Sequence, residues 1–167
     1  MHALAAAALC AAACRRAAPP PPEAQQQTFE GLTLSQSDAG APAWTLRARR
    51  AFLHEDQNRA DLEAPVMDFY TDGKASSRVV ARGGFVDTLT HDVLLSSGVV
   101  VDSFQDHSHL TTEALTYSSK TGMMKTDLPV TIRRPDGVVR GRGLLAKPDL
   151  SEMRIFNQRS VLSGRDE

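Results

Sequence analysis

The residues whose types best suit metal binding are Asp106, His107 and His109, which lie in the segment QDHSH. In an extended strand, His107 and His109 would project to the same side, as two ligands of one ion must. No third ligand follows at a spacing known from zinc sites, so a polar loop between two strands explains the segment better. We therefore predict that the chain binds no metal and needs no other cofactor.

Candidate nucleophiles and acid–base pairs are also incomplete. Ser96 and Ser97 lack the flanking glycines of a nucleophile elbow. The acidic residues Asp61, Glu63 and Asp68 do not all fall on one strand face, where a general acid and base would work together, unless another strand supplies a partner. The sequence thus predicts a protein that is not an enzyme, and a sugar-processing enzyme is the least favoured alternative.

The charge pattern excludes nucleic acids as partners. Nineteen basic residues are scattered among twenty acidic ones, and no aromatic stacking motif lies beside a basic cluster. The densest cationic stretch contains Arg133, Arg134, Arg140 and Arg142. Such arginines are typical of a solvated strand face, and contact with anionic lipid phosphates is the alternative.

The first residues predict targeting rather than folded structure. Ala3 to Ala13 form an apolar run of eleven residues, whereas a membrane-spanning helix needs roughly 20. Cys14 follows three alanines, as the lipidated cysteine of a bacterial lipoprotein does, although no Lys or Arg precedes the apolar run. The alternatives are a discarded signal peptide that contains Cys14 and a start site further upstream. We assign residues 1–14 to this targeting segment.

A tether rich in Pro and Gln follows at residues 15–27, and residues 28–164 form the predicted domain. The two cysteines of the chain, Cys10 and Cys14, both precede the domain. The domain therefore has no disulfide and must be stable through packing and hydrogen bonds.

The elements that would position any site are predicted to be β-strands. Between residues 93 and 132, short apolar and β-branched runs end within eight to twelve residues at Gly, Ser, Asp or Pro. Leu128, Val130 and Ile132 recur at every second position, so one face of their strand is apolar. Further strands are expected at residues 28–35, 44–52, 62–70, 78–89 with a bend at Gly83 and Gly84, and 153–162.

An internal repeat connects the two halves of the domain. Three landmark pairs share a separation of 64 residues: Leu46 and Leu110, Pro65 and Pro129, and Gly73 and Gly137. A shared register of this kind predicts equivalent units, each of which buries its apolar edge on the next.

The same strands and turns resemble a known family. The chain contains Leu-x-x-Gly-Val-x-Val at residues 95–101, Leu-Thr-Thr-x-x-Leu-x-Tyr at 110–117, Asp-Leu-Pro-Val at 127–130 and Gly-x-Gly at 141–143. These patterns are similar to the repeat shared by the lipopolysaccharide-export proteins LptA and LptC and the N-terminal part of LptD. The resemblance covers residues 29–164, and the first half is more similar to LptC than to LptA.

The resemblance implies an all-β fold, an open, twisted β-jellyroll or solenoid-like stack of antiparallel strands with an apolar interior groove. It also implies that the groove holds the acyl chains of lipid A, the lipid part of lipopolysaccharide. Plain core packing is the alternative for each residue expected to line the groove. These residues are Leu46, Leu62, Met67, Phe69, Phe85, Leu115, Tyr117, Leu128, Val130, Ile132 and Ile155.

The resemblance further implies partners at both ends of the stack, an inner-membrane Lpt ABC transporter and an LptA-like bridge protein. The edge strands expected to meet them contain Phe29, Leu32 and Leu34 at the transporter end, and Met153, Ile155 and Val161 at the bridge end. The protein would work in the periplasm, attached to the inner membrane through its N-terminus, and would pass lipopolysaccharide from transporter to bridge. A free LptA-like bridge protein and a structural β-solenoid without lipid are the alternatives.

Overall fold

The computed structural model describes residues 27–162, which form one antiparallel sheet of 12 strands and a single short 3-10 helix. The predicted targeting segment, Cys14 and all of the predicted tether before Gln27 lie outside the described residues. In chain order the elements are β1 (Gln27–Asp38), β2 (Ala41–His54), η1 (Glu55–Gln57), β3 (Arg59–Glu63), β4 (Val66–Thr71), β5 (Lys74–Val80), β6 (Gly83–Asp87), β7 (Val93–Ser103), β8 (His109–Ser118), β9 (Met123–Arg134), β10 (Gly137–Ala146), β11 (Met153–Ile155) and β12 (Arg159–Leu162).

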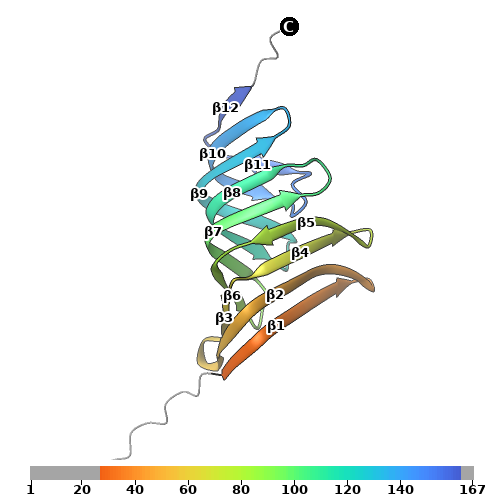
Figure 1. The fold of residues 1–167 in the computed structure, drawn as a ribbon, viewed down its shortest axis with the longest axis vertical. Coiled ribbons are helices and arrows are strands. Elements are labelled where there is room, and N and C mark those ends of the chain that lie inside the picture. The colour runs from red at the N-terminus through yellow and green to blue at the C-terminus, as the bar shows by residue number, and fades with distance from the viewer. Residues whose placement is uncertain (1–26, 163–167) are drawn as a thin grey trace, which may run out of the picture.

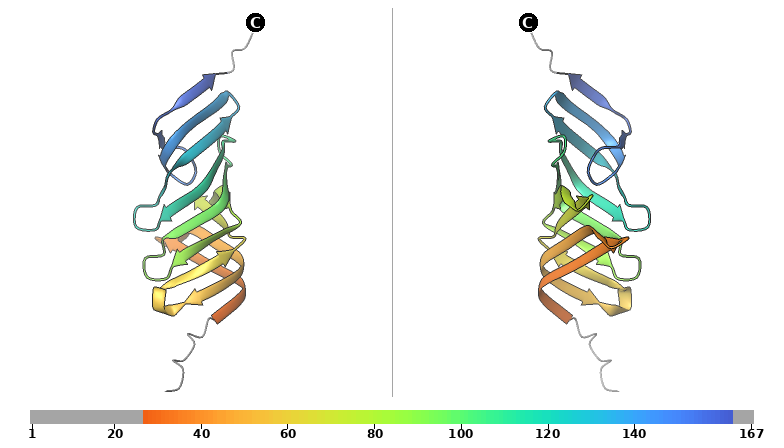
Figure 2. Two further views of the ribbon diagram at one scale, coloured as in Figure 1. Left: turned by 90° about the vertical axis from the view of Figure 1, so that its left-hand side faces the viewer. Right: turned by 90° about the vertical axis from the view of Figure 1, so that its right-hand side faces the viewer.

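The sheet folds over so that its two halves face each other as layers of a jellyroll (Figure 1; Figure 2). One part of β2 pairs with β4 and the other part pairs with β3. In the same way, β7 pairs with β5 through one part and with β6 through the other. We name the half that contains β4, β5 and β12 half-sheet A, and the half that contains β3, β6 and β11 half-sheet B. The strands β1, β2 and β7 to β10 run through both halves.

Backbone irregularities mark the line along which the sheet folds. Gly31 interrupts β1 at φ 70°, and Ala64, at φ 50°, separates β3 from β4. The pairing register shifts next to Gly98 in β7 and at Gly143 in β10, both with φ 89°. An extra or left-handed residue bends a strand and increases its twist. These positions therefore allow a single strand to serve both half-sheets.

Apolar side chains from both half-sheets form one core between them. Leu46 and Met67 of half-sheet A and Leu95 and Met124 of half-sheet B are at most 2% exposed. The outer face carries charged residues instead, because successive side chains of a strand point to opposite faces. The core thus confirms the alternation that the sequence predicts for an all-β jellyroll.

The predicted strands are present, but several are divided where the sheet folds. Residues 62–70 belong to β3 and β4, because Ala64 and Pro65 interrupt the strand. The bend expected at Gly83 and Gly84 lies instead at Ala81 and Arg82, between β5 and β6. Residues 153–162 are likewise divided into β11 and β12. Apolar alternation continues on both sides of each break, so it does not reveal the breaks.

The repeat landmarks occupy comparable places in the fold. Gly73 lies between β4 and β5, and Gly137 begins β10 directly after the turn from β9. Pro65 precedes β4, and Pro129 lies in β9 beside a register shift. Each proline therefore stands near the line along which the sheet folds.

Candidate functional site

The interior between the half-sheets contains most of the residues predicted to line a groove. Ile155 on β11 is partly buried and packs against the core. Eight others are at most 8% exposed inside it: Leu46, Leu62, Met67, Phe69, Leu115, Tyr117, Val130 and Ile132. Because these side chains pack against one another, a guest molecule must separate the half-sheets to enter.

Two predicted groove residues lie outside this core. On β6, Val86 is 2% exposed, whereas its neighbour Phe85 has the guanidinium carbon of Arg59 4.5 Å from its ring centre. The break before β6 changes which residues of the strand face inward, so Val86 takes the place predicted for Phe85. Leu128 lies at the register shift of β9 and borders a hollow on the outer face.

The interior opens along one side, between the turns of half-sheet A and those of half-sheet B. We call this side the lateral opening. A hollow of about 370 Å³ lies there, and its border includes Tyr70 of β4, Gly122 of the turn between β8 and β9, and Pro148 after β10. The inward residues Phe69 and Tyr117 also reach this hollow. The opening therefore leads directly to the apolar interior.

Contacts across the lateral opening hold the half-sheets together. Tyr117 of half-sheet B packs edge-to-face against Trp44 and Phe69 of half-sheet A, with ring centroids 6.3 and 4.9 Å away. Ser119, in the turn after β8, donates a hydrogen bond of 2.9 Å from its hydroxyl to Oε1 of Gln36 on β1. We call these five residues the latch. Burial raises the pKa of the Tyr117 hydroxyl, so the ring stays neutral well above neutral pH.

Sequence patterns reveal only part of the latch. Phe69 and Tyr117 are predicted from strand alternation, and Trp44 lies on the same predicted face as Leu46. Gln36 and Ser119 are ordinary polar residues near turns, 83 positions apart. Only the twist of the folded sheet brings these two side chains together.

Each end of the sheet is a strand with one unpaired edge among the described residues. β1 pairs only with β2, whereas β11 and β12 pair only with β10. The residues predicted for the two edges lie in these strands: Phe29, Leu32 and Leu34 in β1, Met153 and Ile155 in β11, and Val161 in β12. In β1, the three residues pair with Ala51, Ala48 and Leu46, which belong to the core. The core therefore continues to the free edge of β1, where Phe29 is 44% exposed.

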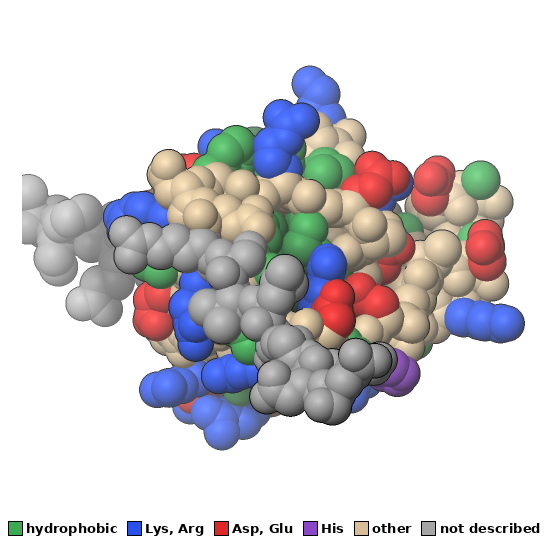
Figure 3. All heavy atoms as spheres, turned by 90° about the horizontal axis from the view of Figure 1, so that it is seen from above, with side chains coloured by type: hydrophobic (Ala, Val, Ile, Leu, Met, Phe, Trp, Pro, Cys, Tyr) green, Lys and Arg blue, Asp and Glu red, His purple; other side chains and the backbone are tan. Residues whose placement is uncertain are grey.

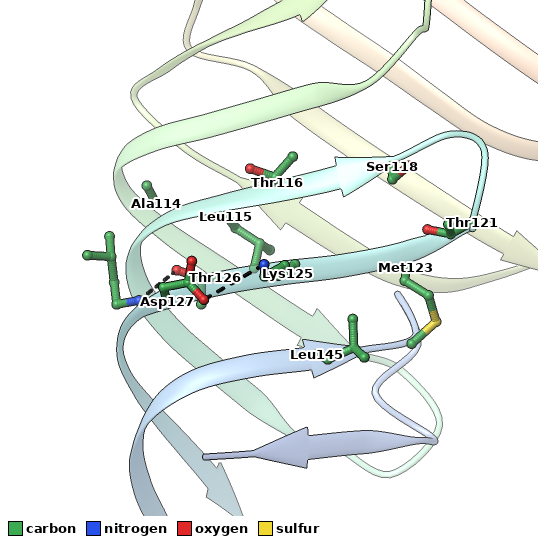
Figure 4. A pocket seen from close by; sticks show the side chains of 11 residues that line it. Ala114, Leu115, Thr116, Ser118, Thr121, Met123, Lys125, Thr126, Asp127 and Leu145 are labelled. Atoms are coloured by element: carbon green, nitrogen blue, oxygen red, sulfur yellow. Dashed lines mark hydrogen bonds and ion pairs between the residues drawn. The ribbon is translucent and has the colours of Figure 1, made fainter. Parts of the chain in front are cut away.

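A larger hollow, of about 640 Å³, lies against β8, β9 and β10 (Figure 4). Thr116, Lys125 and Leu145 border it and pair with one another across the three strands. Each alternates with a core residue of its strand, so this hollow belongs to the outer face of half-sheet B. Its floor includes the buried residues Leu115 and Thr126, so it adjoins the core from the outer side.

Two of the three residues considered for metal binding, Asp106 and His109, have structural partners, and His107 is exposed. Asp106 accepts hydrogen bonds from the backbone N–H and the hydroxyl of Ser108, at 3.0 and 2.7 Å. His109 pairs through Nδ1 with Asp102 of the neighbouring strand at 2.6 Å. Within residues 27–162, no three His, Cys, Asp or Glu side chains are placed to share a metal ion.

The acidic residues considered for acid–base chemistry form ion pairs on the outer face. Asp68 is 3% exposed and is held between Arg47 and Arg78, with Arg78 Nε 2.6 Å from its carboxylate. Glu63 pairs in the same way with two arginines of β2. Asp61 pairs with Arg59 of the same strand at 2.6 Å and with His54 of β2 at 3.1 Å. Each of the three carboxylates thus has a partner on a neighbouring strand.

Acidification is expected to destabilise the domain below about pH 4. The hydrogen bond from Arg59 lowers the pKa of Asp61 from its ordinary 3.8, and that from Arg50 lowers the pKa of Glu63 from 4.5. The backbone N–H groups of Thr90 and Leu89 lower the pKa of Asp87. A carboxylate with a lowered folded pKa stabilises the fold above its unfolded pKa, and this contribution is lost as the pH falls through the folded value.

Urea unfolding between pH 7 and pH 2.5 measures this effect. The unfolding midpoint should be nearly constant from pH 7 to pH 5 and should then fall. Asp61→Asn should reduce the slope of that fall, because Asn cannot be protonated. A midpoint that rises as the pH falls below 4 would contradict the assignment.

The fold and the site together define an all-β jellyroll with an apolar interior, a lateral opening and an unpaired strand at each end. A family model described as lipopolysaccharide-assembly, LptC-related, matches residues 6–161. The chain therefore belongs to the LptC family, which assigns it a role in lipopolysaccharide transport. The comparison with curated proteins finds no match. Among residues 27–162, none belongs to a helix capable of crossing a membrane.

Proposed function

We propose that this protein receives lipopolysaccharide from an inner-membrane ABC transporter at its β1 end and passes it to an LptA-like bridge protein at its β11–β12 end. The observation that carries this proposal is a single apolar core that runs between two unpaired strand edges. An unpaired edge can add a strand from another protein, which would extend both the sheet and its interior.

The interior can shield the acyl chains of the lipid from water. Each buried methylene contributes about 0.8 kcal/mol, so an acyl chain of a dozen carbons gains on the order of 10 kcal/mol from a shielded path. The core side chains already shield one another, and the lipid must replace their contacts. We therefore infer that the half-sheets separate at the lateral opening when lipid enters, and that the latch closes again after it leaves.

The N-terminus supplies the attachment in this proposal. Residues 1–14 would anchor the chain to the inner membrane, with Cys14 as the lipidated residue, and the tether would let the β1 edge reach the transporter. The domain would then stay attached to the membrane, whereas an LptA-like bridge protein is free in the periplasm.

Photo-cross-linking is expected to separate an interior path from surface binding. We would place p-benzoylphenylalanine at Phe29, Phe69 or Ile155, which face the interior, and at Phe52 or Phe85, which do not. After incubation with lipopolysaccharide and irradiation, the interior positions should form cross-links at least tenfold more often than the other two.

Phe69 and Phe85 form a matched pair, because at both positions p-benzoylphenylalanine replaces a phenylalanine. Circular dichroism of each variant checks that the sheet is retained. Equal cross-linking at both classes of position, or none at any of them, would contradict the proposed path. A structural β-solenoid without cargo predicts the second of these results.

A further inference from the structure

Arg134 places a positive charge at the β11 end of the apolar interior. We call this end of the interior the mouth. It ends β9 on the same face as Val130 and Ile132, and it borders a hollow of about 170 Å³ at the β11 end of the sheet. Apolar side chains of Ile132, Val139, Met153 and Ile155 form most of the remaining border. A guanidinium in such surroundings is unusual, because charged groups are seldom left near apolar walls without a partner.

The hydrogen bonds of Arg134 are incomplete. Its Nε is buried and has no partner within residues 27–162, and its Nη2 donates to Met153 Sδ at 3.4 Å. A thioether sulfur is a weak acceptor, so it compensates poorly for the water that the guanidinium has lost. A buried donor without a good acceptor lowers stability, and an oxygen ligand would restore the missing hydrogen bonds.

Asp106, whose carboxylate interacts electrostatically with Arg134, does not supply that oxygen. Burial acts to raise the pKa of Asp106, and hydrogen bonds from Ser108 outweigh it; the charge of Arg134 adds a smaller lowering. Both carboxylate oxygens of Asp106 are engaged by Ser108. No carboxylate in the described part of the chain lies within ion-pair distance of Arg134.

The two ends of the sheet also differ in how their arginines are paired. Near the β1 end, five arginines hold carboxylates: Arg47, Arg49, Arg50, Arg59 and Arg78. On β9 to β11, the ion pairs of the described residues involve lysines, and four further arginines have none: Arg133, Arg140, Arg142 and Arg154. Viewed from this end, Lys and Arg side chains lie at several places on the rim, with Asp and Glu side chains among them (Figure 3). The arginines without ion pairs at this end favour the approach of anions to the mouth.

We propose that Arg134 binds the phosphate of an anionic lipid headgroup while the acyl chains occupy the adjoining interior. The proposal rests on the proposed function, because it names the part of the lipid that this end recognises. The guanidinium fork matches a phosphate group with two parallel hydrogen bonds, and the apolar border accommodates the first methylenes. Arg134 is therefore a specificity-determining residue, whereas each arginine outside the hollow adds only a weak, non-specific attraction of anions.

Equilibrium binding of two lipids to the purified full chain tests this proposal. The probes are lipid A with both phosphates and the same lipid with both removed, each in detergent micelles at low salt. Arg134→Gln should weaken binding of the phosphorylated lipid about ten- to a hundredfold and leave binding of the dephosphorylated lipid unchanged. Arg134→Lys should restore part of the loss, because it keeps the charge but not the fork.

Arg140→Gln is the matched control, since Arg140 lies on the neighbouring strand, is exposed and has no ion pair. It should change either affinity less than threefold. An equal loss in the two variants would overturn the proposal in favour of a general attraction of anions, including acidic proteins. A loss for both lipids with Arg134→Gln would indicate a merely structural role.

Two further measurements show whether the role of Arg134 or the proposed function itself has failed. Inorganic phosphate alone should not bind measurably, and binding as tight as that of the phosphorylated lipid would assign the site to free phosphate instead. If the unmodified protein binds neither lipid, the proposed function itself fails. If it binds both lipids equally, only the role of Arg134 fails.

Discussion

Cross-linking Gln36 to Ser119 is expected to reduce loading of lipopolysaccharide at least tenfold. The hydrogen bond between these two side chains joins half-sheet A to half-sheet B across the lateral opening. Beside it, Tyr117 packs against Trp44 and Phe69. A covalent bond at this point prevents the half-sheets from separating, and the filled interior then has no room for an acyl chain.

The experiment uses the double variant Gln36→Cys, Ser119→Cys in a chain whose two cysteines are changed to serine. A short bismaleimide linker that a reducing agent cleaves joins the new thiols, and fluorescent lipopolysaccharide reports loading before and after cleavage. Loading should be low in the linked protein and should recover when the linker is cut. The comparison is made on one sample, so differences in folding between variants do not affect it.

A second pair of cysteines provides the control. Ser35 and Thr45 form a hydrogen bond of 3.3 Å between β1 and β2, both within half-sheet A. A linker between cysteines at these positions adds the same chemistry without crossing the opening, and loading should be unchanged. If the linked latch variant loads as much lipid as the control, lipid enters through the ends of the sheet and the latch has no part in entry.

Gly84→Ala is expected to destabilise the domain by about 3 kcal/mol. A Cβ at Gly84 would lie 2.3 Å from the carbonyl oxygen of Leu94 and 3.2 Å from the Cα of Leu95. These atoms belong to the backbone of β7, with which β6 is paired, so no side-chain rotation relieves the overlap. The strands must move apart, which disrupts their hydrogen bonds and the burial of Val86.

The adjacent glycine is a matched control in the same strand. A Cβ at Gly83 would meet the oxygen of Leu62 at 3.8 Å, which is ordinary contact. Gly83→Ala should therefore change the free energy of unfolding by less than about 1 kcal/mol, and a smaller loss of chain entropy favours the alanine. Urea unfolding followed by the fluorescence of Trp44, the only tryptophan of the chain, measures both variants. Similar midpoints for the two would show that β6 and β7 are less closely packed than described.

Much of the fold could be predicted from local sequence patterns. Alternation at Leu128, Val130 and Ile132 predicts a strand with one apolar face, and the turn at Asp72 and Gly73 predicts a hairpin. Both correspond to observed strands, β9 and the β4–β5 pair. Such features depend on residues within a few positions of one another, so a linear pattern contains the information.

The residues of the site could be identified only from the folded sheet. Phe85 shows why, because a break of two residues before β6 decides whether Phe85 or Val86 faces inward, and apolar alternation is compatible with either. Arg134 shows the opposite case, in which a charged residue occupies an inward position at the end of an otherwise apolar series. In the sequence it belongs to the same cationic stretch as its neighbour Arg133, although adjacent side chains of a strand point to opposite faces.

The pairing order of the strands has a consequence for how the domain is made. Each of β7, β8, β9 and β10 pairs with the next strand in the chain, and β12 returns to β10. A chain delivered N-terminus first would find the partner of each new strand already in place, and hairpins of this kind close quickly. Among the described residues β12 pairs only with β10, so its outer edge is open. A strand from a neighbouring protein could pair with this edge just as β12 pairs with β10. Assembly between molecules would then use the same strand-pairing step as folding of the single chain.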